Sequence, residues 1–214
     1  MKNINTIIWD WNGTLLNDIE LCRNIVNKLL QERGKKLLST EHYKNIFNFP
    51  VRDYYVEAGF DFSKEHFSKP ADAFISEYNK EIPNAALHQN AEIALERFKN
   101  NNFKQIIISA MEHESLIFSI KNKGIHHYFD EISGINNHYA AGKLENAISI
   151  LNKNNLNPDT CCLIGDTIHD HEVAESLGCS CILIAAGHQS YERLLKTGRK
   201  VVHNIDQLFD CYFN

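Results

Sequence analysis

Four short stretches of the chain are continuously apolar and rich in β-branched residues. They span residues 4–9, 103–109, 160–165 and 180–185. A strand that is buried on both faces carries such a run, whereas a strand with one wet face alternates between apolar and polar residues. The pattern therefore predicts four strands in the interior of a parallel sheet.

Helical patterns separate these predicted strands. They cover residues 90–101, 112–124, 143–155 and 170–178. In the third of them, Leu144, Ala147, Ile148 and Leu151 recur at helical spacing, and Gly124 and Gly178 follow two others as C-caps. Alternation of strands and helices predicts an α/β fold, a doubly wound, Rossmann-like parallel sheet covered by helices on both faces.

Residues 16–88 break this alternation. They contain no run typical of a buried strand, and helical patterns cover residues 18–34, 40–47, 51–60 and 63–82. Gly and Pro residues punctuate these patterns, as they do at turns. We therefore expect an α/β core domain made of residues 1–15 and 89–214, with residues 16–88 inserted as a helical domain.

Composition narrows the class of protein. The 214 residues are 43% hydrophobic and 23% charged, with a formal net charge of −5. The chain has no basic excess, so nucleic acid is not an expected partner. No apolar run is long enough to span a bilayer, and the N-terminus does not resemble a signal peptide. We expect a cytoplasmic protein without a membrane partner; the sequence leaves its oligomeric state open.

The six cysteines of the chain also fit a cytoplasmic protein. Cys161, Cys162, Cys179 and Cys181 lie in or beside apolar runs, at spacings of one or two positions rather than the Cys-x-x-Cys typical of zinc sites. Cys22 falls in a helical pattern and Cys211 lies near the C-terminus. We interpret them as buried thiols that behave as small apolar side chains.

Polar side chains follow the ends of the first three predicted strands. The carboxyl ends of parallel strands meet at one edge of the sheet, where ligands bind. A lysine also opens the helical pattern between the second and third ends. The side chains that this places together are Asp10, Asn12, Thr14, Ser109, Ala110, Lys143, Asp166 and Asp170.

This combination suits phosphoryl chemistry. Two carboxylates, Asp10 and Asp166, together with a backbone carbonyl and waters are the ligands that Mg²⁺ prefers. Gly13 allows the backbone to approach a ligand closely, so that its N–H groups can hold phosphate oxygens. Lys143 supplies a compact cation for a nucleophile and a phosphoryl group. A carboxylate beside Mg²⁺ can form an aspartyl phosphate.

These motifs resemble those of the haloacid dehalogenase-like hydrolase superfamily. The string IIWDWNGTL resembles its first motif, IIIS its second, Lys143 its third and CLIGDTIHDHEVAESLG its fourth. The helical insert lies where many members carry a cap domain, between the first and second motifs. The resemblance covers nearly the whole chain and is strongest to phosphoglycolate-phosphatase-like members with a helical cap.

The resemblance implies a role for each matching residue. Asp10 would attack phosphorus; Asp10, the carbonyl of Asn12 and Asp166 would hold Mg²⁺. The remaining positions would have supporting roles: Thr14 supports the turn, Ser109 and the N–H of Ala110 bind the phosphoryl group, Lys143 pairs with Asp10, and Asp170 orients the metal shell or Lys143. The expected substrate is a small phosphorylated metabolite.

Asn12 departs from the motif of the phosphatases, which carry a second Asp there as general acid and base. An amide cannot exchange a proton in this way, and such help commonly contributes about 10²–10⁴-fold. Three alternatives stay open. In the first, the chain is a phosphatase that tolerates Asn12, with a good leaving group or another acid such as His169, His113 or a residue of the insert. In the second, it is a slow or inactive phosphate-binding regulator. In the third, it catalyses another reaction of the superfamily, of the phosphonatase or dehalogenase type.

Three further residues carry weaker predictions. Arg52 is a candidate contact for a carboxylate or second phosphate of the substrate, since its guanidinium can bind such a group through two hydrogen bonds. His169 and His171 flank Asp170. We interpret both histidines as partly exposed residues of a helix-opening turn rather than as transition-metal ligands.

Overall fold

A computed structural model describes residues 4–135 and 142–212 of the chain, without the side chains of residues 210–212. Within them a six-stranded sheet has the strand order β5-β4-β1-β6-β7-β8, and every neighbouring pair is parallel. The strands are β1 (Thr6–Trp9), β4 (Lys104–Glu112), β5 (Glu131–Ile135), β6 (Cys161–Gly165), β7 (Ser180–Ile184) and β8 (Lys200–Val202). The predicted α/β fold with a parallel sheet is confirmed.

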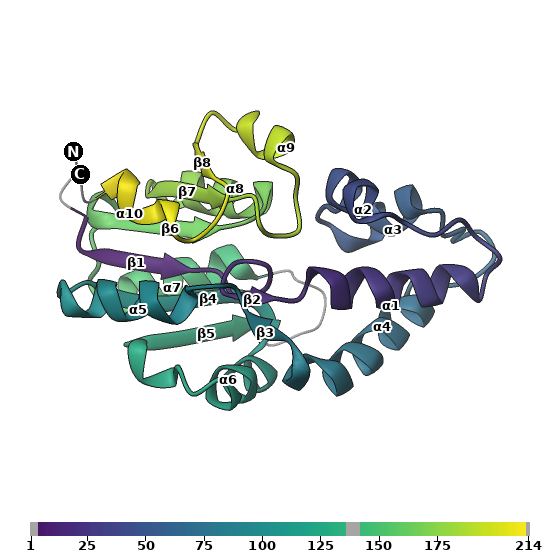
Figure 1. The fold of residues 1–214 in the computed structure, drawn as a ribbon, viewed down its shortest axis with the longest axis horizontal. Coiled ribbons are helices and arrows are strands. Elements are labelled where there is room, and N and C mark those ends of the chain that lie inside the picture. The colour runs from purple at the N-terminus through teal and green to yellow at the C-terminus, as the bar shows by residue number, and fades with distance from the viewer. Residues whose placement is uncertain (1–3, 136–141, 213–214) are drawn as a thin grey trace.

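Helices cover both faces of this sheet (Figure 1). Successive residues of a strand point to opposite faces, and accordingly Ile7 and Trp9 belong to one apolar core while Ile8 belongs to the other. The first core is completed by α5 (Ala91–Asn100), α6 (His113–Asn122) and α10 (Gln207–Tyr212). The second is completed by α7 (Lys143–Lys153), α8 (Ile168–Leu177) and α9 (Tyr191–Leu195). Short 3₁₀ turns η2 (His126–Tyr128) and η3 (Pro158–Thr160) precede β5 and β6.

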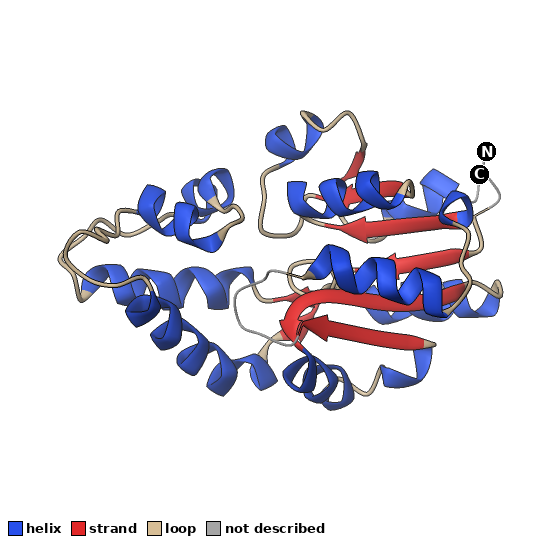
Figure 2. Cartoon of the chain, turned by 180° about the vertical axis from the view of Figure 1, so that it is seen from behind, coloured by secondary structure: helices blue, strands red, loops and turns tan. Residues whose placement is uncertain are grey.

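A helical insert, residues 19–84, extends beyond the carboxyl ends of the strands (Figures 1 and 2). It consists of α1 (Ile19–Gln31), α2 (Thr40–Ile46), α3 (Val51–Ala58), α4 (Ser68–Glu81) and the 3₁₀ turn η1 (Ile82–Asn84). Two short antiparallel strands, β2 (Leu16–Asn17) and β3 (Ala86–Leu87), join its two ends. The domain boundaries expected at residues 15/16 and 88/89 stay a prediction.

The sequence pattern misses the two edge strands, β5 and β8. The four runs that it identifies are the four central strands of the sheet. Three residues of β5 are only half-buried, and β8 has three residues of which one is buried. An edge strand has a neighbour on one side only and needs no continuous apolar run, so this signal cannot find it. The short helices α9 and α10 lie beside β8 in the sequence and are missed with it.

Candidate active site

A cavity of about 400 Å³ lies between the carboxyl ends of the strands and the helical insert. Asp10, Asn12, Ala110, Lys143 and Asp170 line it from the side of the sheet. Helices α1 to α4 contribute the opposite wall. The strand ends that the sequence places together therefore do meet at one site.

Asp10 and Lys143 form the centre of the charged side of this cavity. Asp10 follows β1, and its backbone N–H donates to the carbonyl of Ile164 in the neighbouring strand β6, 2.9 Å away. Lys143 is the first residue of α7, and its Nζ lies 2.5 Å from Asp10 Oδ1 and 2.6 Å from Asp170 Oδ1. All three side chains are at least nine-tenths buried, so the lysine is held between two carboxylates away from bulk water.

Burial and charge shift the pKa values of this group in opposite directions. Burial raises the pKa of Asp10 to about 8, against the attraction of Lys143 and with the repulsion of Asp170 and Asp166. Burial alone would lower the pKa of Lys143, but Asp10 and Asp170 raise it above its ordinary value. The lysine is therefore charged at neutral pH, while the ionised form of Asp10 needs more positive charge than this one ammonium supplies.

The turn after β6 holds Asp166 and Asp170 in fixed orientations. Thr167 is the N-cap of α8, and a reciprocal capping box joins it to Asp170. Asp170 Oδ2 accepts from the N–H of Thr167 at 3.0 Å and from its hydroxyl at 2.7 Å. Asp166 Oδ1 accepts from Thr14 Oγ1 at 2.9 Å, and Oδ2 accepts from the N–H of His188 at 2.6 Å. These bonds fix both carboxylates before any ligand arrives.

Three carboxylates converge on one point. Oxygen atoms of Asp10, Asp166 and Asp170 all lie within 4.8 Å of one another. Burial raises the pKa of Asp166 to about 6, against the attraction of His188. A hard divalent cation prefers an all-oxygen ligand set of this kind. Gly13 has a φ of 72°, and a Cβ at this position would overlap the Asp166 carboxylate, so only glycine fits the turn.

Ser109 lies beside Asn12. Its hydroxyl is 3.4 Å from Asn12 Oδ1 and accepts from the N–H of Met111 at 3.1 Å. Ser109 is buried, whereas Ala110 lines the cavity directly. Both residues lie within β4, which continues to Glu112, and not after its end as the apolar run predicts. β4 thus brings one hydroxyl against the Asn12 amide and one backbone segment to the cavity wall.

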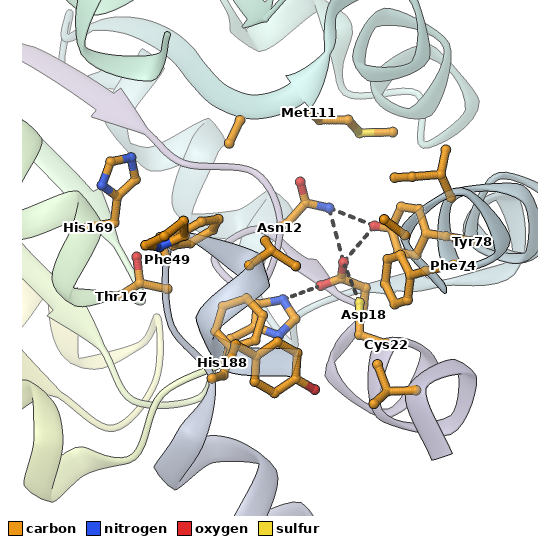
Figure 3. A pocket seen from close by; sticks show the side chains of 18 of the residues that line it. Asn12, Asp18, Cys22, Phe49, Phe74, Tyr78, Met111, Thr167, His169 and His188 are labelled. Atoms are coloured by element: carbon orange, nitrogen blue, oxygen red, sulfur yellow. Dashed lines mark hydrogen bonds and ion pairs between the residues drawn. The ribbon is translucent and has the colours of Figure 1, made fainter. Parts of the chain in front are cut away.

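Asn12 donates into a second buried group of polar side chains. Its Nδ2 lies 3.0 Å from Asp18 Oδ2 and 2.6 Å from the hydroxyl of Tyr78 (Figure 3). That hydroxyl also donates to Asp18 Oδ2 at 2.6 Å. The N–H of Gly13 and Nε2 of His188 lie 2.9 and 3.1 Å from Asp18 Oδ1. Asp18 is 1% exposed, and both of its oxygens are therefore satisfied without solvent.

His188 links this carboxylate to the insert. Its Nδ1 lies 2.8 Å from the hydroxyl of Tyr43 in α2. Burial alone would raise the pKa of Asp18, but His188 lowers it to about 2. Burial alone would lower the pKa of His188, but Asp18 raises it. Each of the two side chains therefore favours the charged form of the other. Cys22 Sγ lies 3.7 Å from Asp18 Oδ2, so the group Asp18, Cys22 and His188 is a hydrogen-bonded network as it stands.

The three weaker candidates, Arg52, His169 and His171, differ in where they lie. Arg52 and His169 both line the cavity. The guanidinium carbon of Arg52 lies 5.4 Å from the ring centre of Phe62, and His169 Nδ1 is 3.4 Å from Glu172. His171 accepts from Arg199 Nε at 3.0 Å instead of facing a metal site.

His113 is not among the cavity-lining residues of the described chain. Its Nδ1 accepts from the N–H of Gly134 at 3.2 Å. The five described cysteines are buried, as expected. The side chain of Cys211 lies outside the described part of the chain.

The sequence pattern misses Asp18, Tyr43, Tyr78 and His188. One of them, His188, could have been found from the sequence. His188 follows the end of β7, and the strand-end argument that selects Asp10 and Asp166 would select it too when applied to the fourth strand. The other three lie on or beside helices of the insert, where buried tyrosines and a helix-opening aspartate are common, and only the tertiary structure brings them together.

Comparisons with known proteins agree with this geometry. The family model for haloacid dehalogenase-like hydrolases matches residues 7–184, and no curated protein matches the chain. A haloacid dehalogenase-like hydrolase from Streptococcus pneumoniae has a similar structure, with a TM-score of 0.84, 22% identity and 100% of each chain covered.

Two further solved structures share the fold at lower identity. One, described as a predicted phosphatase from Clostridium acetobutylicum, has a TM-score of 0.82 at 19% identity over 97% of each chain. The other, described as a predicted phosphoglycolate phosphatase from Haemophilus somnus, has a TM-score of 0.78 at 17% identity over 99% of each chain. No described helix is both long and apolar enough to span a bilayer. On the family match, which extends from the first predicted strand to the fourth, the chain belongs to the haloacid dehalogenase-like hydrolases.

Proposed function

We propose that this protein is a Mg²⁺-dependent phosphatase that hydrolyses a small phosphorylated metabolite in the cytoplasm through an aspartyl phosphate on Asp10. One observation carries the proposal: a buried carboxylate at the end of β1 lies 2.5 Å from the buried ammonium of Lys143 and within reach of two further carboxylates. A nucleophile, a cation for the phosphoryl group and an oxygen ligand set therefore share one site, at the floor of a cavity that can admit an ester.

The carboxylates suit a divalent cation. Asp10 and Asp166, with the backbone carbonyl of Asn12, are the ligands proposed for Mg²⁺. The metal would neutralise negative charge on the phosphoryl oxygens. Both oxygens of Asp170 already accept hydrogen bonds from Lys143 or Thr167, which supports a role for Asp170 in orienting Lys143, beside its predicted place in the metal shell.

The other residues bind and orient. Ser109 and the N–H of Ala110 are proposed to hold the phosphoryl oxygens, and Thr14 keeps Asp166 in position through its 2.9 Å hydrogen bond. Lys143 pairs with Asp10 and with the transferred group. Residues 16–88 are proposed as a cap domain over the core, and Arg52 as a contact for a negatively charged part of the substrate.

Asn12 favours a second candidate function. A site that binds a phosphate ester but turns it over slowly would act as a phosphate-binding regulator. A phosphatase with Asn12 must hydrolyse its intermediate without the usual base, which is the step most sensitive to this difference.

A screen of phosphate esters with Mg²⁺, on wild type and Asp10→Asn, tests the proposal. Release of inorganic phosphate by wild type, lost in Asp10→Asn and in excess EDTA, is expected. Thermal melts of both proteins control for folding. Undiminished turnover by Asp10→Asn would contradict the assignment of the nucleophile, and binding of esters without turnover would favour the second candidate.

A further inference from the structure

The insert side of the cavity is aromatic. Phe47 and Phe49 follow α2, Tyr54 lies on α3, and Phe74 and Tyr78 lie on α4. In Figure 3 the ring of Phe49 lies on one side of Asn12 and the rings of Phe74 and Tyr78 lie on the other. Phe74 stacks on Tyr78 with ring centres 5.7 Å apart and planes at 13°. These rings form a wall suited to a flat, apolar group.

Few charges are available in this half of the cavity for a polar leaving group. Asp18 Oδ1 and His188 Nε2 are paired with each other at 3.1 Å. Lys143 is held by two carboxylates. Among the described lining residues, Arg52 is the remaining lysine or arginine; it is the one such cation left for a negatively charged part of the substrate, and its guanidinium lies over Phe62. A leaving group that itself carries a carboxylate, such as glycolate, would find mostly apolar surface here.

A second observation is independent of the cavity wall and concerns the proton. Nδ2 of Asn12 donates toward Asp18 Oδ2 and the hydroxyl of Tyr78, and an amide nitrogen does not release its hydrogens as protons to a leaving group. Position 12 therefore has no proton for a departing oxygen. Asp18 is no substitute, because its two oxygens accept hydrogen bonds from five groups. Without a proton from either side chain, a leaving oxygen that is stable as an anion is favoured.

We propose that the substrate is an aryl phosphate, the phosphate monoester of a phenol. This inference rests on the proposed function and names its substrate class. A phenol has a pKa near 10 and leaves as its anion far more easily than an aliphatic alcohol, whose acidity is close to that of water at about 16. The aromatic wall and the missing proton donor thus select the same compounds for different reasons.

The reaction balances without a proton from position 12. An oxygen of Asp10 forms a bond to phosphorus while the bond from phosphorus to the phenolic oxygen breaks, and the phenolate leaves with the electron pair. Water then attacks the phosphorus of the aspartyl phosphate, which restores the Asp10 carboxylate and gives inorganic phosphate. The proton released by that water neutralises the phenolate in solution.

Kinetics on wild type provide the first test. We expect kcat/KM with Mg²⁺ to be higher for phenyl phosphate and 2-naphthyl phosphate than for 2-phosphoglycolate and glycerol phosphate. Across substituted phenyl phosphates, the rate should rise steeply as the pKa of the phenol falls. Two results would overturn the proposal and leave the proposed function standing. One is an equal rate for alkyl and aryl esters. The other is a rate that does not depend on the pKa of the phenol, as protonation of the leaving group by His169 would give.

Binding of stable analogues tests the aryl substrate class separately from the proposed phosphatase function. Calorimetry with Mg²⁺ should show phenylphosphonate binding more tightly than phosphonoacetate, although neither has an ester bond to cleave. This result without any esterase activity would support the aromatic cavity and contradict the proposed function. Tighter binding of phosphonoacetate would overturn the substrate class whatever the activity.

Variants of the wall provide the third test. Phe74→Ala should raise KM for phenyl phosphate by about 2- to 12-fold, the range expected for loss of one aromatic contact. Phe74→Tyr should keep the wild-type KM. Phe118→Ala, which removes a 60% exposed phenylalanine of α6, is the matched control. An unchanged KM in Phe74→Ala and in Phe49→Ala would overturn the proposal.

Discussion

Two buried clusters of charge lie on either side of the Asn12–Gly13 turn, and they differ in their balance. The lysine cluster (Asp10, Lys143, Asp166 and Asp170) sets three carboxylates against one ammonium. The histidine cluster (Asp18, Tyr43, Tyr78 and His188) sets one carboxylate against one imidazole, with two hydroxyls that complete the hydrogen bonding.

The pKa values follow from this difference. In the lysine cluster, burial raises the pKa of Asp10 to about 8, so the cluster is unfavourable as it stands and needs a further cation. In the histidine cluster, the pKa of Asp18 falls to about 2 despite burial, because the charge of His188 attracts the carboxylate and His188, Tyr78 and Asn12 donate hydrogen bonds to it. Uncompensated charge in a cavity indicates ligand binding, whereas a balanced pair indicates a structural role.

Lys143→Met should have the largest effect. It leaves Asp10 and Asp170 buried without their cation, and breaking such a pair commonly costs about 3–5 kcal/mol of stability. Removing one electrostatic contact to the phosphoryl group lowers kcat by about 10³-fold. Urea unfolding and phosphate release measure the two effects. Lys121→Met, at an exposed position of α6, is the control, and equal effects of both variants would contradict the role of Lys143.

Asp166→Ala should weaken Mg²⁺ binding by about 10- to 100-fold, since it removes a charged oxygen ligand. Isothermal titration of the metal measures this effect directly. Asp166→Asn removes the charge but keeps one oxygen, which can accept from Thr14 or from the N–H of His188, so it loses less of the hydrogen bonding than Asp166→Ala does. Asp72→Ala, on the surface of α4, should bind Mg²⁺ as wild type does. An unchanged affinity in Asp166→Ala would place the metal elsewhere.

Asp18→Asn should lower the unfolding free energy at pH 7 by about 2 kcal/mol, the equivalent of moving one carboxyl pKa from about 3.8 to about 2. A depressed carboxyl pKa contributes stability that is present above pH 4 and lost as pH falls toward 2. Wild type should therefore lose stability over that interval, and Asp18→Asn should lose less. Denaturant curves from pH 2 to 7 measure this, with Asp53→Asn as the exposed control. Identical curves for wild type and Asp18→Asn would show that the pair contributes nothing.

The same two clusters show what the sequence can predict. The lysine cluster comes from strand ends, and apolar runs locate strand ends well, so Asp10, Asp166 and the helix-opening Lys143 are predictable. The central strands are predictable for the same reason, and the edge strands β5 and β8 are not, because they need no apolar run.

The histidine cluster is predictable only in part. Asp18, Tyr43 and Tyr78 belong to three separate helical patterns, and nothing in the spacing along the chain indicates that they meet. The meaning of Asn12 is lost with them. On sequence alone it is a missing acid, whereas in the structure it is the donor that an ionised Asp18 requires, and a carboxylate in its place would lie against another carboxylate.

Asn12→Asp should have the smallest effect, and it tests whether the two clusters influence each other. Two carboxylates about 3 Å apart cannot both ionise at low cost, so the pKa of the new carboxyl is expected to rise. In its protonated form, this carboxyl could donate to a leaving oxygen but could not act as the base for water. We expect about a tenfold gain for alkyl phosphates, below the full acid–base range of about 10²–10⁴, and little gain for p-nitrophenyl phosphate, whose phenolate leaves unaided.

Rapid-quench mass spectrometry should then detect the phosphate adduct on Asp10 in both wild type and Asn12→Asp, because the base is missing in both. Adding Asp18→Asn to Asn12→Asp removes the neighbouring charge, lets the new carboxyl ionise and should reduce the adduct. Equal adduct levels in the single and double variants would show that the Asp18 carboxylate has no influence on position 12. In that case the two clusters act separately, and Asn12 limits turnover for a reason that lies within the lysine cluster.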